Sequence, residues 1–199
     1  NMFHSFNFNQ QEVDLQQYYF FKEGFSKEQL EKIEKDVATL PFVNASTAGG
    51  TDKKVRSSSV KWIPQNNDWW WLYETLADYA TQANFALWNF DLHQIPEKIQ
   101  YTEYYASQQG HYDWHADIGP GLLSKRKISI TVQLSEADEY EGGDMEVFKG
   151  GSMNGPFDKA PRKAGCVFIF PSFLMHRVSP VTKGTRKSFV LWLGGSHYK

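Results

Sequence analysis

Apolar residues recur every three or four positions in two segments of the first half of the chain, which predicts two helices. The first helix carries its apolar face on Leu30, Ile33, Val37 and Leu40. Ser26-Lys-Glu-Gln29 in front of it matches a capping box, and Pro41 ends it. The second helix covers about residues 68 to 84, and its apolar face is formed by Leu72, Leu76, Tyr79 and Ala83.

The pattern changes after this point to short apolar or alternating runs separated by Gly, Pro and Asp, which is typical of strands. The predicted strands are Phe85–Asp91, Ile99–Tyr105, Lys127–Leu134, Met145–Phe148, Gly165–Phe170, His176–Pro180 and Lys187–Leu193. Helices followed by many short strands indicate an α+β fold whose body is a sandwich or jelly roll. We expect a single domain over residues 1–199, with mainly helical support and a loop over 1–84 and the β core over 85–199.

Two further segments interrupt these patterns. Residues 44 to 59 are rich in Gly, Ser, Thr and Lys, which predicts a long polar loop, and a loop of that length is usually functional or mobile. Trp69-Trp70-Trp71 opens the second helix. Aromatic side chains are most often buried, so core packing is the first interpretation of these residues, and a place in a peptide groove is the second.

Composition narrows the class of protein. The 199 residues are 41% hydrophobic, which is enough for a packed interior, and the net charge of −2 provides no basic surface for nucleic acid. Cys166 is the one cysteine, so no disulfide forms within the chain, and its apolar neighbours predict a buried thiol. We expect neither a membrane span nor a signal peptide, and we expect a cytoplasmic location.

Candidate chemistry is concentrated between residues 115 and 186. His115 and Asp117 are separated by one residue, so both side chains project to the same side of an extended strand, and His176 follows at a strand entry. Two imidazoles and one carboxylate form the facial triad that binds non-haem Fe(II) and leaves positions open for substrate and oxygen. Taken alone, a His-x-Asp pair often arises by chance, and His176 by itself is more simply explained as a core residue.

Arg186 and Ser188 alternate onto one side of the last predicted strand. A buried arginine is costly unless it is paired, so Arg186 must contact either an acid of the protein or a carboxylate of a ligand. If Asp117 binds a metal, few acids remain in the strand region to pair with this arginine, which favours a ligand. A planar guanidinium suits a carboxylate, and a 2-oxo acid is therefore the candidate co-substrate.

Four motifs resemble the prolyl 4-hydroxylases and related 2-oxoglutarate/Fe(II)-dependent dioxygenases. They are Tyr105-x4-Gly110-x-Tyr112-x2-His115-x-Asp117, Tyr140-Glu-Gly-Gly-Asp-Met145, the segment from Phe170 through His176 to Arg186, and Val55-Arg56-Ser57-Ser58 with Trp62. The similarity extends from about Val55 to Gly195, and the motifs occur in the family's order.

The resemblance implies a double-stranded β-helix (jelly roll) with N-terminal supporting helices. Fe(II) would be bound by His115, Asp117 and His176, and 2-oxoglutarate would chelate the iron while its distal carboxylate pairs with Arg186 and Ser188. Further expected contacts of the co-substrate are Tyr105, or Tyr104 after a one-residue shift, and with them Thr131 and Gln133. Arg56 and Tyr112 are candidate substrate contacts, although Arg56 could equally anchor its strand.

The same resemblance implies a hydroxylase that consumes O2 and converts 2-oxoglutarate to succinate, with ascorbate as a candidate accessory reductant. Asp117 favours hydroxylation over halogenation, because related halogenases lack this carboxylate. Peptidyl proline in a peptide or protein is the expected substrate, and a small molecule or another side chain is the alternative. Residues 44–59 and the segment Gly119–Lys125 are candidate lids over such a substrate.

Two rival interpretations stay open at this stage. A catalytically inert binding domain of the same fold would normally have lost a metal ligand or the arginine. A zinc hydrolase on a jelly roll would use His and Asp, but it has no need of Arg186 and Ser188. Oxygen-dependent consumption of 2-oxoglutarate separates both rivals from a hydroxylase. The sequence does not determine the oligomeric state.

Overall fold

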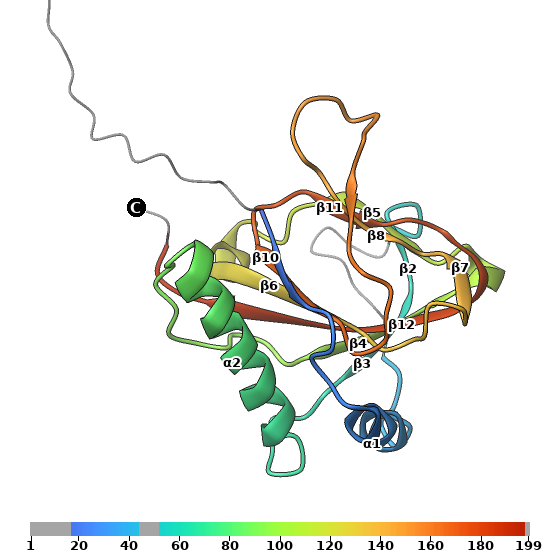
Figure 1. Ribbon diagram of the computed structural model, residues 1–199, viewed down its shortest axis with the longest axis horizontal. Coiled ribbons are helices and arrows are strands. Elements are labelled where there is room, and N and C mark those ends of the chain that lie inside the picture. Colours follow the sequence, from blue (N-terminus) through green and yellow to red (C-terminus); the bar gives the residue numbers. More distant parts are fainter. Residues whose placement is uncertain (1–16, 44–51, 198–199) are drawn as a thin grey trace, which may run out of the picture.

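Two antiparallel sheets face each other in the computed structural model, which describes residues 17–43 and 52–197 (Figure 1). The seven-stranded sheet has the order β1 (Tyr19–Phe21), β10 (Val167–Pro171), β6 (Arg126–Gln133), β12 (Val181–Gly194), β4 (Gln100–Tyr105) and β3 (Ser59–Trp62), and β7 (Tyr140–Gly142) also pairs with β12. The five-stranded sheet has the order β2 (Arg56–Ser57), β5 (His111–His115), β11 (His176–Val178), β8 (Met145–Val147) and β9 (Asp158–Lys159). This is the expected jelly roll.

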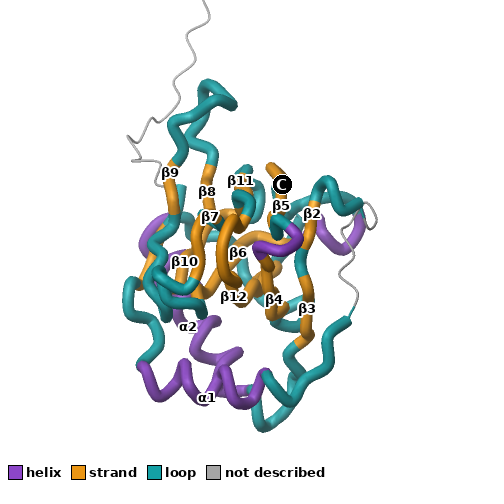
Figure 2. The backbone as a smooth tube through the Cα atoms, turned by 90° about the vertical axis from the view of Figure 1, so that its right-hand side faces the viewer, coloured by secondary structure: helices purple, strands orange, loops and turns teal. Residues whose placement is uncertain are grey.

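Both helices cover the outer face of the seven-stranded sheet, at the bottom of Figure 2. Helix α1 (Lys27–Val37) begins with the predicted capping box: the Ser26 hydroxyl accepts from the Gln29 amide at 3.2 Å, and the Ser26 amide donates to Gln29 Oε1 at 2.9 Å. Helix α2 (Trp70–Leu87) buries Leu72, Leu76 and Ala83, as predicted.

Strict alternation along β6 separates the two faces of this sheet. Ile128, Ile130 and Val132 join the cluster beneath the helices. Ser129 and Thr131 point the other way, into the space between the sheets, where a second apolar cluster includes Phe168, Phe170 and Val178. Polar side chains on an otherwise apolar interior face require partners, so this face of β6 points to the functional site.

The predicted strand Phe85–Asp91 is wrong, because α2 continues to Leu87 and an irregular turn follows. The Asn84 side chain stabilises this turn: its Oδ1 accepts from the Phe90 amide at 2.8 Å and its Nδ2 donates to the Phe90 carbonyl at 2.9 Å. Asn89 takes the left-handed conformation (φ 52°) that such a turn requires. The apolar run therefore belongs to a helix end and its cap.

The predicted boundaries before residue 85 also need correction. β1, β2 and β3 all belong to the two sheets, so the β core is not confined to 85–199. β2 lies inside the segment 44–59 that was predicted as loop, and residues 44–51 of that segment are outside the described residues. The paired backbone of Arg56 and Ser57 with Tyr112 and His111 overrides the low strand propensity of this polar sequence.

Several other residues follow the sequence predictions. Cys166 is buried, and burial raises the pKa of its thiol to about 11. Trp69 and Trp71 pack into the core with α2, whereas Trp70 is 46% exposed. In the described part of the chain no helix combines the length and the apolar character needed to cross a membrane.

Candidate active site

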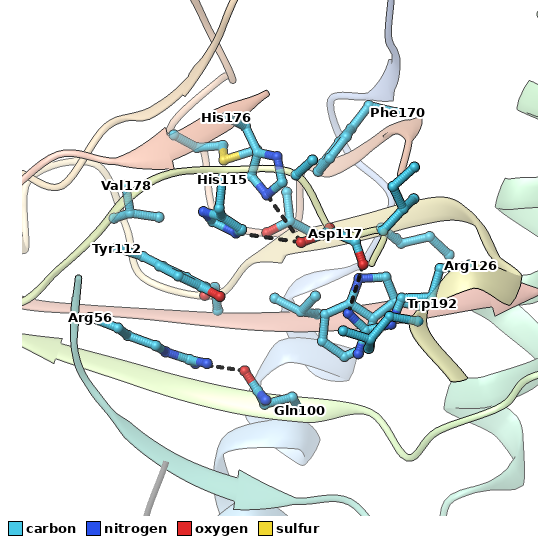
Figure 3. Close-up of a pocket in the computed structure, with 18 of the residues that line it drawn as sticks. Arg56, Gln100, Tyr112, His115, Asp117, Arg126, Phe170, His176, Val178 and Trp192 are labelled. Atoms are coloured by element: carbon cyan, nitrogen blue, oxygen red, sulfur yellow. Dashed lines mark hydrogen bonds and ion pairs between the residues drawn. The ribbon is translucent and has the colours of Figure 1, made fainter. Parts of the chain in front are cut away.

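The candidate metal ligands come together where β5 and β11 pair. His115 ends β5, His176 begins β11, and the two residues are direct partners in the ladder. Asp117 follows β5 by two residues, and its Oδ1 lies 3.4 Å from His115 Nε2 and 3.5 Å from His176 Nε2 (Figure 3). The three potential ligand atoms lie within 4.8 Å of one another, so they could hold one metal ion.

Backbone carbonyls fix the orientation of both imidazoles. His115 Nδ1 donates to the Asp113 carbonyl at 2.7 Å, and His176 Nδ1 donates to the Leu174 carbonyl at 2.8 Å. Since a carbonyl can only accept, each ring carries a proton on Nδ1, which leaves Nε2 as the atom that faces Asp117 and would bind a metal. This second shell of hydrogen bonds is the arrangement typical of metal-binding histidines.

Asp117 is held by two serines that the sequence analysis missed. Ser129 Oγ donates to Asp117 Oδ2 at 2.6 Å and contacts Ser172 Oγ at 3.0 Å, while the Asp117 amide donates to the Ser172 carbonyl at 2.9 Å. Oδ1 is thereby left to face the imidazoles. Burial would raise the pKa of Asp117, but the charge of His176 and hydrogen bonds from both imidazoles hold it well below its usual range. The carboxylate is an anion, as a metal ligand must be.

The Tyr112 ring stacks on the His115 ring, and the Arg56 guanidinium stacks on Tyr112. The Tyr112 ring lies 3.6 Å from the His115 ring at an interplanar angle of 14°, and the Arg56 guanidinium lies 4.8 Å from the Tyr112 ring centre. Burial, together with the nearby charge of His176, lowers the pKa of His115 and favours the neutral imidazole that a metal requires. Both candidate substrate contacts therefore lie at the metal-binding histidines.

Arg186 enters the same cavity from β12. Its side chain is only 2% exposed, its Nη1 donates to Ser188 Oγ at 3.4 Å, and its Nε has no hydrogen-bond partner among the described residues. The turn at Gly142-Gly143 makes room for it: Gly143 has φ +62°, and a Cβ there would lie 3.3 Å from Arg186 Cδ and 2.8 Å from Val181 Cγ2. A buried guanidinium without an acid partner needs an anionic ligand.

Alternation on β4 decides between the two tyrosines. Tyr104 is buried, lines the cavity and lies beneath the Arg186 guanidinium, 5.5 Å from its ring centre. Tyr105 does not line the cavity, because its hydroxyl turns to the opposite face of the sheet and donates to Glu103. The expected contact at Tyr105 is therefore corrected to Tyr104. Thr131 lines the cavity, whereas Gln133 lies in a small adjoining pocket and donates to Tyr140 Oη.

The cavity has a volume of about 440 Å³ and opens beside the metal-binding residues. Arg126, which the sequence analysis did not select, forms part of its wall: it makes two 2.6 Å bonds to Glu97, donates to the Asp117 carbonyl at 3.1 Å and covers Trp192 at 3.6 Å. None of Trp69, Trp70 and Trp71 lines this cavity, and Trp69 and Trp71 pack into the core, as the first interpretation expects. Trp62 and Trp192 line it in their place.

The donor set fits Fe(II) and a 2-oxo acid. Two imidazoles, each offering Nε2, and one carboxylate on one side of an ion leave further coordination positions facing the cavity. The unpaired Arg186 Nε provides an independent observation, since it lies in the same cavity and has no protein carboxylate to pair with in the described regions. The fold and this donor set together define an iron- and 2-oxo-acid-dependent oxygenase as the class of protein.

Comparison with known proteins gives the same class. Residues 99–194 match the family model of the 2OG-Fe(II) oxygenase superfamily. A PKHD-type hydroxylase of Rippkaea orientalis is 25% identical over 177 residues, which cover 86% of this chain and 75% of the relative. A PKHD-type hydroxylase of Acinetobacter baumannii is 29% identical over 183 residues, which cover 84% of this chain and 74% of the relative.

Among solved structures, a prolyl hydroxylase from Trichoplax adhaerens, in complex with a peptide of the hypoxia inducible factor oxygen degradation domain, shares the fold. Its TM-score is 0.72 at 16% identity, and the match covers 89% of this chain and 83% of that one. The matched residues 99–194 place the chain in the 2-oxoglutarate/Fe(II) oxygenase superfamily, and its fold is similar to that of a prolyl hydroxylase. It is a dioxygenase that uses Fe(II), 2-oxoglutarate and O2.

Proposed function

We propose that this protein is a 2-oxoglutarate-dependent hydroxylase of peptidyl proline. The observation that carries the proposal is that the His115–Asp117–His176 cluster and the unpaired Arg186 open into one cavity. When bound, iron and 2-oxoglutarate supply the oxidation of a substrate C–H bond by O2, with release of succinate and CO2.

The side chains have distinct roles in this proposal. His115, Asp117 and His176 hold the metal, and the backbone carbonyls and serines behind them keep their ligand atoms oriented. Arg186 and Ser188 bind the distal carboxylate of 2-oxoglutarate, with Tyr104 and Thr131 on either side. Apolar walls of Met145, Phe170 and Val178 exclude water from the ligand atoms and strengthen these charge interactions.

The choice of proline rests on similarity. The chain resembles proteins named PKHD-type hydroxylases, and the protein that shares its fold is named a prolyl hydroxylase and was solved with a peptide. The cavity is open to solvent and has His115 and Tyr112 in its wall, which suits an extended peptide. A hydroxylase of a small molecule remains the second candidate, because a cavity of about 440 Å³ would also enclose one. A cytoplasmic location is part of the same proposal, since the one cysteine is a buried thiol.

The test is a peptide screen read by mass spectrometry. Purified protein with Fe(II), 2-oxoglutarate and ascorbate in air should add one oxygen atom to proline in a subset of proline-containing peptides. The same peptides with alanine in place of that proline should stay unmodified. Oxygen addition at another residue, or only to free small molecules, would replace proline with that substrate.

A further inference from the structure

The arginines of the chain fall into two groups. Three of the five, Arg126, Arg162 and Arg177, form ion pairs with Glu97, Asp144 and Glu146. Arg56 and Arg186 form no ion pair within the described residues, and both line the cavity. This fold therefore pairs its structural arginines with acids and leaves two cavity arginines without one.

The protein contacts of Arg56 leave part of its guanidinium free. Nε donates to Ser58 Oγ at 2.8 Å and Nη2 donates to Gln100 Oε1 at 2.6 Å, and both acceptors are neutral. Nη1 donates to no acceptor in the described part of the chain, although an arginine offers five N–H groups. The group is half-buried and fixed by these bonds and by stacking on the Tyr112 ring, which lies between Arg56 and His115, so little rotamer freedom is lost when it binds a ligand (Figure 3).

The acids close to Arg56 along the chain and on the paired strand β5 accept hydrogen bonds from other groups. Asp52 Oδ1 accepts from the Lys54 amide at 2.9 Å, and Asp113 Oδ1 accepts from the Trp114 amide at 2.8 Å. Two acids lie in the wall of the cavity. Glu97 pairs with Arg126, and Asp117 faces the metal-binding imidazoles. Once Arg186 has bound 2-oxoglutarate, Arg56 is the uncompensated positive charge of the cavity.

We propose that Arg56 selects substrates that carry a carboxylate close to the hydroxylated position. The stack from Arg56 through Tyr112 to His115 places this charge close to the metal-binding histidines (Figure 3). Trp62, 38% exposed on the wall of the same cavity, offers an apolar surface for the uncharged part of the substrate. The proposal rests on the hydroxylase function and adds to it the charge of the substrate.

The carboxylate could belong to an acidic side chain of a peptide or to a free acid, and a matched panel of probes distinguishes them. One arm uses acetylated, amidated proline peptides with Glu, Gln or Lys at each position from three before to three after the proline. The other arm uses N-acetylproline and its amide. Affinity is measured by calorimetry on protein loaded with Mn(II) and 2-oxoglutarate, and turnover is measured with Fe(II).

In either the peptide arm or the N-acetylproline arm, we expect the acidic probe to bind roughly 10- to 100-fold more tightly than its neutral counterpart, as for a hydrogen-bonded charge pair. The arm that shows this preference identifies the source of the carboxylate. Arg56→Glu should reverse the order, so that Lys-containing peptides bind better than Glu-containing ones, and Arg56→Gln should abolish the difference. Lys35→Glu is the matched control: it makes the same change in net charge at an exposed position of α1 and should leave the order unchanged.

Equal binding of acidic and neutral probes to the wild-type protein in both arms would overturn the proposal, whether or not the Arg56 variants fold. An acidic preference that persists in a folded Arg56→Gln variant would also overturn it. The proposed function fails in a different way, through absence of succinate release from 2-oxoglutarate by the wild-type protein without any probe. The two failures are therefore separable.

Discussion

The side chains that bind the metal in our proposal depend on residues that touch no ligand. Asp117 could turn either oxygen toward the imidazoles, and the hydroxyl of Ser129 holds Oδ2 and leaves Oδ1 to face them. Ser129 in turn contacts Ser172, so the geometry of one carboxylate depends on strand β6 and on the turn that follows β10. A carboxylate with one oxygen held in this way is oriented before the metal arrives.

Removal of the Ser129 hydroxyl tests whether its hydrogen bond orients Asp117 for metal binding. Ser129→Ala should weaken metal binding by roughly 10- to 100-fold, because the loss of outer hydrogen bonds to ligands typically costs this much. Titration with Mn(II), followed by calorimetry, measures the effect. Ser196→Ala is the matched control, since it also removes a hydroxyl that donates to an aspartate, Asp91, which does not line the cavity. Equal affinities of the two variants would mean that Asp117 needs no such support.

Arg186 is predicted to act on 2-oxoglutarate and not on the metal. Arg186→Ala should raise the KM for 2-oxoglutarate by roughly 10- to 100-fold, the usual cost of a lost charge-assisted hydrogen bond. Mn(II) affinity should stay as in the wild type. Arg186→Lys should recover part of the loss, because lysine keeps the charge but not the planar fork. If Arg186→Ala unfolds the protein and leaves the KM of the folded fraction unchanged, the arginine is structural.

At the scale of elements, the sequence predicts what local patterns encode. The capping box at Ser26, the apolar face of α1 and the strands β4, β6, β8, β10 and β11 follow from propensity and periodicity. The polar strand β2 does not, because its extended form comes from pairing with β5. Ser129, Arg126 and Glu97 carry no motif of their own. Only the alternation along β6, which turns Ser129 inward, could have signalled the first of them.

The capping box gives a prediction at this scale. Ser26→Ala removes the acceptor of the Gln29 amide and should lower the free energy of unfolding by about 1 kcal/mol. Ser26→Thr keeps an acceptor and should lower it by less. Urea denaturation followed by circular dichroism measures both variants. A wild-type value for Ser26→Ala would show that α1 is held by its packing on the sheet alone.

At the scale of the whole molecule, one face of the seven-stranded sheet packs the apolar core and the other face carries the residues of the site. The outer face of the seven-stranded sheet is apolar and carries both helices, with residues such as Ile130 and Leu191. The inner face carries Ser129, Thr131, Arg186 and Ser188 toward the cavity. Of these inner residues the family motifs contain Arg186 and not Ser129, and the choice of Tyr104 over Tyr105 required the register of β4 against β12.

Cys166 lies in the packed body of the molecule, and its reactivity reports on that packing. The thiolate is the reactive form, and burial raises the pKa of this thiol to about 11, so the group is neutral below that pH. Iodoacetamide at pH 8 should therefore leave the native protein unlabelled and label it fully in urea. Labelling of the native protein at the rate of the unfolded one would contradict the buried position of this residue.

The most direct test of the account is succinate release from 2-oxoglutarate by the purified protein with Fe(II), ascorbate and air, compared with Asp117→Ala. We expect slow release by the wild-type protein without added substrate and none by the variant, because Asp117 is one of the three metal ligands that we propose. Equal release by the two proteins would contradict the proposed metal site. No release by either, together with no binding of 2-oxoglutarate in the presence of Mn(II), would contradict the assignment of Arg186 as well.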